Sequence, residues 1–188
     1  MRLSGDSQGL VGERVELRRH DRKNYPLYAE WYGDPEVWHL TSWAAAPLNP
    51  QTSERLFQER EASATDDSFA VHLKGEQEPI GIISLMNISR ANDSADLSVI
   101  LGRPEDRDRG YGAEAIWLLL RYGFEELGMH RVGLSVFEFN EAAIAAYEKL
   151  GFRTEGRLRE ALKREEGFHD AILMSILATE WRQTVAPG

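Results

Sequence analysis

The spacing of apolar residues along the chain predicts an α/β protein in which strands and helices are interspersed. Short apolar or alternating runs predict strands at 13–18, 69–73, 79–88, 96–101, 131–137, 152–155 and 168–178. Apolar residues spaced three and four apart predict helices at 22–32, 35–40, 52–62, 113–127 and 141–150. The charged stretch 157–166 fits a partly helical or an extended segment, and 179–188 has the composition of a polar, frayed tail.

Residues that begin and end helices support these boundaries. Asp21 and Asp34 can each cap a helix that follows them, and Pro35 suits the first helical position. Gly128 can end the helix before it, because glycine readily takes the left-handed conformation found there. Gly81, inside a predicted strand, indicates a bulge.

The order of the predicted elements also indicates how the central strands are connected. A strand, a helix and a second strand follow one another over residues 96–137, which predicts a parallel pair joined by a right-handed crossover. At 188 residues the chain fits a single domain, residues 1–188, with an ordered core over about 10–180.

A glycine-containing segment lies between the strand at 96–101 and the helix that follows it. The segment reads Arg107, Asp108, Arg109, Gly110, Tyr111, Gly112 and Ala113. Glycines at a helix start let a ligand approach open backbone N–H groups, and arginines add positive charge. These residues indicate a pyrophosphate site, although a structural turn would account for them equally well. The segment lacks both the third glycine of a dinucleotide motif and the Gly-Lys-Ser/Thr ending of a nucleotide P-loop.

Composition narrows the range of functions. The chain has no cysteine, which excludes disulfides, thiolate metal sites and an acyl-cysteine intermediate. Its formal net charge of −9 argues against broad nucleic-acid binding and is compatible with cationic partners such as amines. No stretch is apolar enough to span a membrane, and the N-terminus has no signal-like apolar core, so we expect a cytoplasmic protein without a membrane partner. The five histidines show no metal-ligand spacing, so we expect no metal.

Two motifs together resemble those of a known family. Arg107-x-x-Gly110-x-Gly112 resembles the Arg/Gln-x-x-Gly-x-Gly/Ala signature of the GNAT superfamily of N-acetyltransferases, which bind acetyl-CoA. Asn140, followed by Tyr147 seven residues later, is similar to the second motif of that superfamily. The nearest branch is that of the RimJ/RimL and spermidine acetyltransferases. The resemblance implies the GNAT fold: a mixed, mostly antiparallel sheet of about seven strands, flanked by helices, with a central splayed parallel pair.

The resemblance also implies which residues bind acetyl-CoA. The segment 107–113 would hold the pyrophosphate, and backbone groups of Ile100, Leu101 and Gly102 would pair with the pantetheine arm. A backbone N–H near Ile100 would stabilise the oxyanion of the tetrahedral intermediate. Asn140 would contact the cofactor, with capping of the helix that it precedes as the alternative.

The candidate acid and base differ in how well the sequence specifies them. The resemblance makes Tyr147 the general acid for the leaving thiolate, with core packing as the alternative. Related peptide acetyltransferases often have a glutamate five residues before the asparagine, and this chain has Ser135 there, so no base is carried over. Asp96 and Glu138 lie on the two strands expected to flank the thioester, but surface solvation is the simpler explanation for each.

The acceptor is the least specified part of the prediction. Trp38 and Trp43 flank a loop in the region that walls the acceptor site in this superfamily, and each could instead be a core residue. The stretch 43–47 carries alanines and a proline where spermidine-type enzymes place acidic residues, which weakens a polyamine assignment.

The sequence therefore predicts direct acetyl transfer from acetyl-CoA to a primary amine in a ternary complex. The leading acceptor is a protein or peptide N-terminal α-amine. A small-molecule amine, such as a polyamine, an antibiotic or a metabolite, is the runner-up. A non-catalytic CoA sensor and a nucleotide-binding module are weaker alternatives, and a homodimer is left open.

Overall fold

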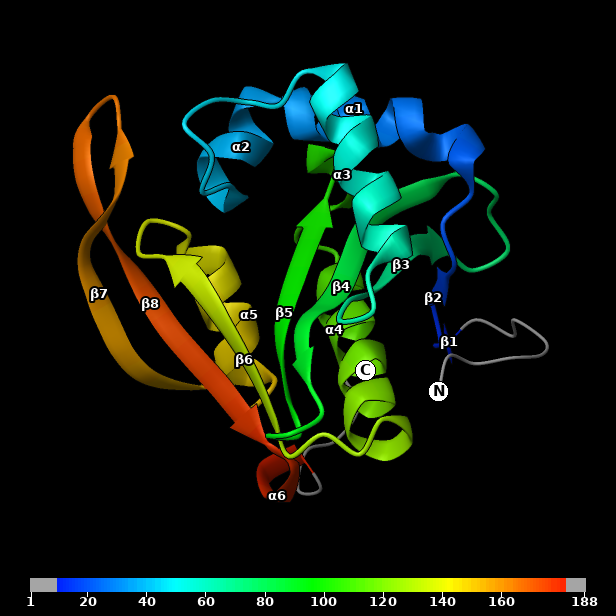
Figure 1. Ribbon diagram of the computed structural model, residues 1–188, viewed down its shortest axis with the longest axis vertical. Coiled ribbons are helices and arrows are strands. Elements are labelled where there is room, and N and C mark those ends of the chain that lie inside the picture. The colour runs from blue at the N-terminus through cyan, green and yellow to red at the C-terminus, as the bar shows by residue number, and fades with distance from the viewer. Residues whose placement is uncertain (1–9, 182–188) are drawn as a thin grey trace.

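One eight-stranded sheet runs through the computed structural model, which describes residues 10–181. The spatial order of its strands is β1-β2-β3-β4-β5-β6-β8-β7 (Figure 1). The strands are β1 (Leu10–Val11), β2 (Val15–Arg18), β3 (Asp67–Leu73), β4 (Pro79–Ser89), β5 (Ser94–Leu101), β6 (Arg131–Phe137), β7 (Arg153–Arg164) and β8 (Gly167–Leu177). All neighbours run antiparallel except β5 and β6, which run parallel. The predicted mixed sheet is confirmed, and the short edge strand β1 raises its count to eight.

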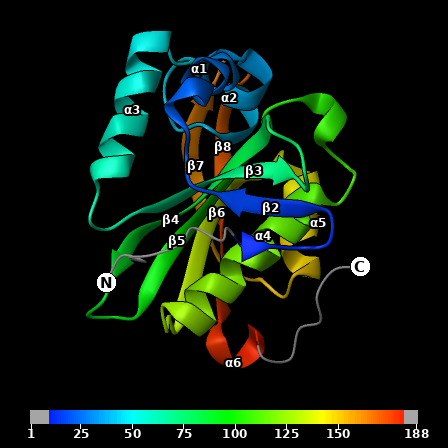
Figure 2. The same cartoon turned by 90° about the vertical axis from the view of Figure 1, so that its right-hand side faces the viewer.

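Helices cover both faces of this sheet, with α4 and α5 on one face and α1, α2 and α3 on the other (Figure 2). The α-helices are α1 (Tyr25–Gly33), α2 (Pro35–Thr41), α3 (Pro50–Ala62), α4 (Tyr111–Arg121), α5 (Glu141–Lys149) and α6 (Ala178–Trp181). The 3-10 turns η1 (Arg22–Asn24) and η2 (Pro104–Asp106) precede α1 and the glycine segment, and the π-helical turn η3 (Tyr122–Glu126) extends α4.

Two clusters of buried apolar side chains hold these layers together. The larger cluster lies between the sheet and the helices α4 and α5, and it includes the fully buried Leu85 and Leu118. The smaller cluster packs Tyr28 and Phe57, from α1 and α3, against Ile82 of β4. Burying a side chain of this size contributes roughly 1.5–3 kcal/mol, so α1, α3, α4 and α5 are fixed mainly by the apolar faces that they present to the sheet.

The local signals at helix ends and in strand β4 are confirmed. The Asp34 carboxylate accepts hydrogen bonds from the backbone N–H groups of Glu36 and Val37, at 2.8 and 2.9 Å, and so caps α2. Asp21 caps η1 in the same way. The register between β3 and β4 shifts next to Gly81, where the bulge was predicted.

The structure settles the prediction for one segment and contradicts it for another. The charged stretch after residue 152 is extended, because it forms β7 and pairs with β8 along its length. The predicted polar tail is wrong for 179–181: α6 places Trp181 at 6% exposure, with its ring 5.4 Å from that of Trp117. A single apolar residue among polar neighbours has no periodicity from which its burial could be read. The rest of the predicted tail, 182–188, lies outside the described residues.

The parallel pair separates soon after it begins. β5 and β6 are in register only at Ser94 with Arg131, Ala95 with Val132, and Asp96 with Gly133. Beyond these pairs, β5 continues to pair with β4, and β6 with β8, so the two strands move apart toward their carboxyl ends (Figure 1). The predicted splayed pair is confirmed, and the gap between the strands leaves part of the β5 backbone without a strand partner.

Candidate functional site

A cavity of about 850 Å³ occupies the space between the separating strands. Its walls come from β5, the glycine segment, β6, the start of α5, and the end of α2 with the loop after it. Residues that are far apart in sequence therefore meet at one place. Of the predicted site residues, the following line it: Trp43, Ile100, Leu101, Arg107, Asp108, Gly112, Asn140 and Tyr147.

The glycine segment ends in an open helix N-terminus. Gly110 has φ +80° and precedes α4, and no side chain caps the first turn of that helix. The N–H groups of the first turn are consequently available to an anion, and the helix dipole favours negative charge there. Arg107 and Gly112 line the cavity, whereas Arg109 lies over the ring of Tyr111 at 5.3 Å.

Hydrogen bonds between Glu114 and the chain at Arg14 and Val15 support the glycine segment, and the sequence did not predict them. The carboxylate of Glu114, in the first turn of α4, accepts hydrogen bonds from the Arg14 backbone N–H, the Arg14 Nε and the Val15 N–H, at 2.8, 3.0 and 3.3 Å. Burial acts to raise the pKa of Glu114, but these donors outweigh it and hold the pKa below its usual value. Arg14 also donates to the Arg109 carbonyl at 3.1 Å. The available signal was a single glutamate in the apolar stretch 113–120.

The β5 backbone presents only alternate residues to the cavity. The Gly102 N–H donates to the Ile80 carbonyl of β4 at 3.0 Å. Because N–H directions alternate along a strand, the Ile100 N–H also points toward β4. Val99 and Leu101 then direct their backbone groups into the cavity. The backbone groups that face the cavity are therefore those of Val99 and Leu101, whereas the N–H groups of Ile100 and Gly102 face β4.

Asn140 has a structural role at the cavity wall. Its side-chain oxygen accepts from the Ala143 N–H at 3.3 Å and so caps α5, which is the alternative that the sequence allowed. Its side-chain nitrogen donates to the Leu40 carbonyl at the end of α2, at 3.2 Å. The residue therefore ties α5 to α2, and it also lines the cavity.

Tyr147 is a buried phenol that faces the same cavity. It is 8% exposed, and its ring packs against Phe152 with the centroids 5.6 Å apart. Its hydroxyl makes no hydrogen bond to any other residue in the described part of the chain. Burial raises the pKa of the Tyr147 hydroxyl to about 12, so the group stays protonated at neutral pH.

The two candidate bases are placed differently. Asp96 lines the cavity, and its carboxylate accepts from the Asn87 side-chain nitrogen at 3.0 Å. Glu138 lies outside the cavity lining and pairs with Arg157 at 2.7 Å. Of these two candidates, only Asp96 lines the cavity.

The two tryptophans predicted to contact the acceptor also differ in their position relative to the cavity. Trp43 lines the cavity, is 51% exposed and meets the ring of Phe137 edge to face at 5.0 Å. Trp38 does not line the cavity. Its indole N–H donates to the Ala44 carbonyl at 2.8 Å, and the Arg164 guanidinium lies 4.2 Å from its ring. Trp38 therefore supports the wall from behind, and of the two tryptophans only Trp43 lines the cavity.

Arg164 fixes the wall that carries these tryptophans. It is 4% exposed, and its Nη2 donates to the carbonyls of Trp38, His39 and Ser42 at 3.2, 3.1 and 2.6 Å. Burial lowers the pKa of its guanidinium below the usual value. A cation at a helix C-terminus satisfies carbonyls that have no partner within the helix, so Arg164 holds the end of α2 against β7.

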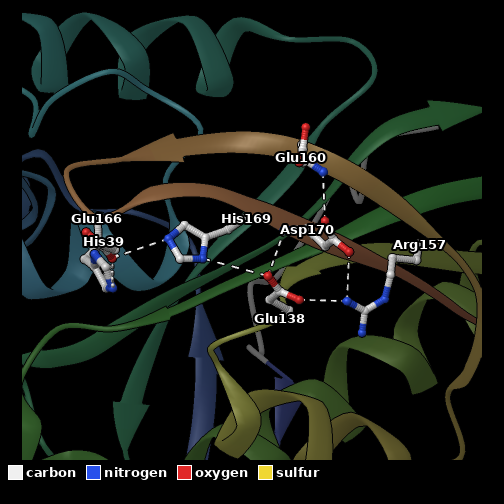
Figure 3. A network of polar contacts seen from close by, with 7 residues as sticks. All are labelled: His39, Glu138, Arg157, Glu160, Glu166, His169 and Asp170. Atoms are coloured by element: carbon white, nitrogen blue, oxygen red, sulfur yellow. Dashed lines mark hydrogen bonds and ion pairs between the residues drawn. The ribbon is translucent and has the colours of Figure 1, made fainter.

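A network of charged side chains beside this wall joins α2, the end of β6 and the hairpin formed by β7 and β8 (Figure 3). The Arg157 guanidinium joins Glu138 and Asp170, at 2.7 and 2.8 Å, and Arg157 thereby holds the pKa of Asp170 below its usual value. His169 lies between Glu138 and Glu166, at 3.8 and 3.5 Å. The carboxylates of Glu138, Glu166 and Asp170 therefore each have a cationic or titratable partner.

Between residues 10 and 181, none of the helices is both long and apolar enough to cross a membrane. Within the same range, no group of three histidine or acidic side chains is arranged to hold a metal ion.

Comparison with known proteins places this site in a family. The model of the acetyltransferase (GNAT) domain matches residues 14–153. "Putative ribosomal N-acetyltransferase YdaF" of Bacillus subtilis is 34% identical over 176 residues, which cover 91% of this chain and 95% of that protein. The spermidine N(1)-acetyltransferase of Escherichia coli (strain K12) is 29% identical over 126 residues, covering 67% of this chain and 66% of that protein.

A solved structure has the same fold. The spermidine N-acetyltransferase from Vibrio cholerae, determined in complex with CoA and spermine, aligns with a TM-score of 0.83 over 92% of this chain and all of that chain, at 23% identity. Because the family model spans most of the chain and a relative of nearly equal length is 34% identical, this protein belongs to the GNAT family and is an acetyl-CoA-dependent N-acetyltransferase.

Proposed function

We propose that the protein transfers the acetyl group directly to a primary amine in a ternary complex, and that the amine is a protein or peptide N-terminal α-amine. The cavity carries the proposal, because it joins the open start of α4 to the wall formed by α2, with Tyr147 between them. Both substrates would then lie in the cavity together. The acceptor class is supported by the relative named as a ribosomal N-acetyltransferase.

The cofactor would be held at two places. The first turn of α4 and Arg107 would bind the pyrophosphate, which requires Arg107 to leave its ion pair with Glu36, at 2.6 Å. The cavity-facing backbone groups of Val99 and Leu101 would pair with the pantetheine arm, as a peptide pairs with a strand edge. One of these N–H groups would also stabilise the oxyanion.

The reaction then needs two proton movements. The amine nitrogen attacks the thioester carbonyl carbon, a C–N bond forms, and the C–S bond breaks. The amine gives up one proton to Asp96, directly or through water. The departing thiolate takes the Tyr147 hydroxyl proton, which solvent later restores.

A small-molecule amine is the second candidate acceptor. The relative named spermidine N(1)-acetyltransferase favours it, but its match covers only 67% of this chain. The two candidates make different demands on the cavity, since a polyamine brings additional positive charges to it.

The kinetic mechanism is the first test. Initial rates at varied acetyl-CoA and varied peptide should give intersecting double-reciprocal lines, because no acetyl-enzyme forms. Parallel lines would contradict direct attack. Transfer to spermidine with no transfer to any peptide α-amine would contradict the proposed acceptor class while leaving acetyl transfer intact.

Gly112→Glu tests the pyrophosphate site. An acidic residue suits the first turn of a helix, and a side chain at this position would make only ordinary contact with Leu101, so we expect the variant to fold. Its charge should raise the Kd for CoA about tenfold or more, which corresponds to ~1.4 kcal/mol. The Kd is measured from the rise in melting temperature as CoA is added. Gly156→Glu, at an open position on β7, is the matched control. If both variants had the same Kd for CoA, the pyrophosphate would have to bind elsewhere.

Asp96→Asn and Glu138→Gln distinguish the two candidate bases. We expect Asp96→Asn to lower kcat/KM for the amine at neutral pH and to recover as the pH rises, because a larger share of the amine is then already deprotonated. Glu138→Gln should retain activity at neutral pH. The pH profiles of both variants check this, and a reversed pattern would assign the base to Glu138.

Tyr147→Phe tests the general acid. Loss of the hydroxyl proton should lower kcat by about 100-fold or more, because general acid–base groups contribute at that level. The Kd for CoA should change little. Tyr122→Phe serves as control, since that hydroxyl donates to Asp67 at 2.9 Å and does not line the cavity. An unchanged kcat in Tyr147→Phe would show that Tyr147 is not the general acid.

A further inference from the structure

The end of the cavity next to α2 is apolar. Its lining there is mostly apolar, with Val37, Leu40, Trp43, Phe137 and Phe139. Its two polar side chains already have backbone partners: Asn140 bonds to the Leu40 carbonyl and the Ala143 N–H, and one threonine hydroxyl donates to a backbone carbonyl. Trp43 leaves half of its surface exposed in this wall. A large ring that is open to a cavity offers dispersion contacts and apolar area to a ligand. This end therefore suits an apolar or aromatic group.

A buried positive charge lies directly behind the same wall. The Arg164 guanidinium carbon is 5.4 Å from the centre of the Phe137 ring, which forms part of the cavity lining. Within the described part of the chain, no carboxylate lies within ion-pairing distance of Arg164, and its buried Nε has no hydrogen-bond partner. The end of α2 supplies roughly half a negative charge, so it balances only part of this cation.

The charge of Arg164 acts on the cavity more strongly than a surface charge would. Solvent and salt screen buried charges poorly. A second ammonium group placed at this end would meet a positive field and an apolar wall, with no counter-ion to replace its hydration.

The nearby carboxylates offset this field only in part, since Glu166 acts on Arg164 from beyond ion-pairing distance. Glu138 and Asp170 are bound to Arg157, and Glu166 lies between two histidines (Figure 3). The carboxylates that line the cavity are on other walls, in β5, the glycine segment, α5 and β7. The wall next to α2 is therefore suited to an uncharged group.

We propose that the acceptor is a monoamine with an apolar or aromatic group beside the reacting nitrogen, and that Trp43 and Arg164 select it against polycations. The inference rests on the proposed acetyl transfer and specifies its acceptor. Trp43 supplies the contact surface for the apolar group. Arg164 acts at a distance and by holding the wall, so it is a positioning residue.

The test compares three acceptors at saturating acetyl-CoA, with release of the CoA thiol as the readout. We expect kcat/KM for phenylalanine amide to exceed that for glycine amide by about tenfold or more, since an apolar group in such a pocket discriminates at this level. Spermidine should be the poorest of the three. In Trp43→Ala, kcat/KM for phenylalanine amide should be close to kcat/KM for glycine amide. In Trp43→Phe, most of the preference for phenylalanine amide should remain.

The controls separate contact from general damage. Phe168→Ala removes a ring that is 61% exposed but lies outside the cavity lining, so its preference for phenylalanine amide should match that of the unchanged protein. Arg164→Met should raise kcat/KM for spermidine relative to glycine amide, and Arg164→Lys should not. If the Arg164 variants unfold, the acceptor preferences of the unchanged protein and of the Trp43 variants still test the proposal.

The possible results also separate this inference from the proposed function. A preference for spermidine, or a preference for phenylalanine amide in Trp43→Ala equal to that of the unchanged protein, would overturn the selectivity and leave acetyl transfer in place. CoA binding without thiol release for any amine would overturn the proposed transfer itself.

Discussion

β5 and β6 share a parallel ladder of only three residue pairs, and the functional site depends on the point at which that ladder ends. A longer ladder would satisfy the β5 backbone within the sheet and would close the cavity. Because each strand keeps its other neighbour, separation of the pair leaves both strands held firmly in the sheet. The unpaired groups of Val99 and Leu101 are therefore rigid and open, which is the state that a pairing ligand requires.

Helix α2 links the cofactor side of the cavity to the acceptor side. Its first turn pairs through Glu36 with Arg107, while the Leu40 carbonyl near its end accepts from Asn140. Arg164 then holds the last carbonyls from the hairpin. The Glu36 pair is exposed and is worth little by itself. The buried contacts at the other end of α2 therefore set its position.

Burial gives the site its chemical character. It keeps the Tyr147 phenol protonated and ready to donate, and it leaves the positive charge of Arg164 poorly screened behind an apolar wall. Asp96 remains in a polar part of the cavity, bonded to Asn87. The cavity therefore holds a buried phenol and an exposed carboxylate, which are the acid and the base of the proposed mechanism.

The sequence by itself determined most of the elements, the parallel pair, the glycine loop and the family, because these depend on periodicity, capping and short local motifs. Asp34 and Gly81 acted as their local chemistry predicted. Only the tertiary structure decided which groups face the cavity. The Ile100 N–H points toward β4 and not into the cavity, and Trp43 lines the cavity whereas Trp38 does not. Arg164 contacts the end of α2, more than a hundred residues earlier in the sequence. Strand register and long-range packing set these choices, and neither leaves a periodic trace in the sequence.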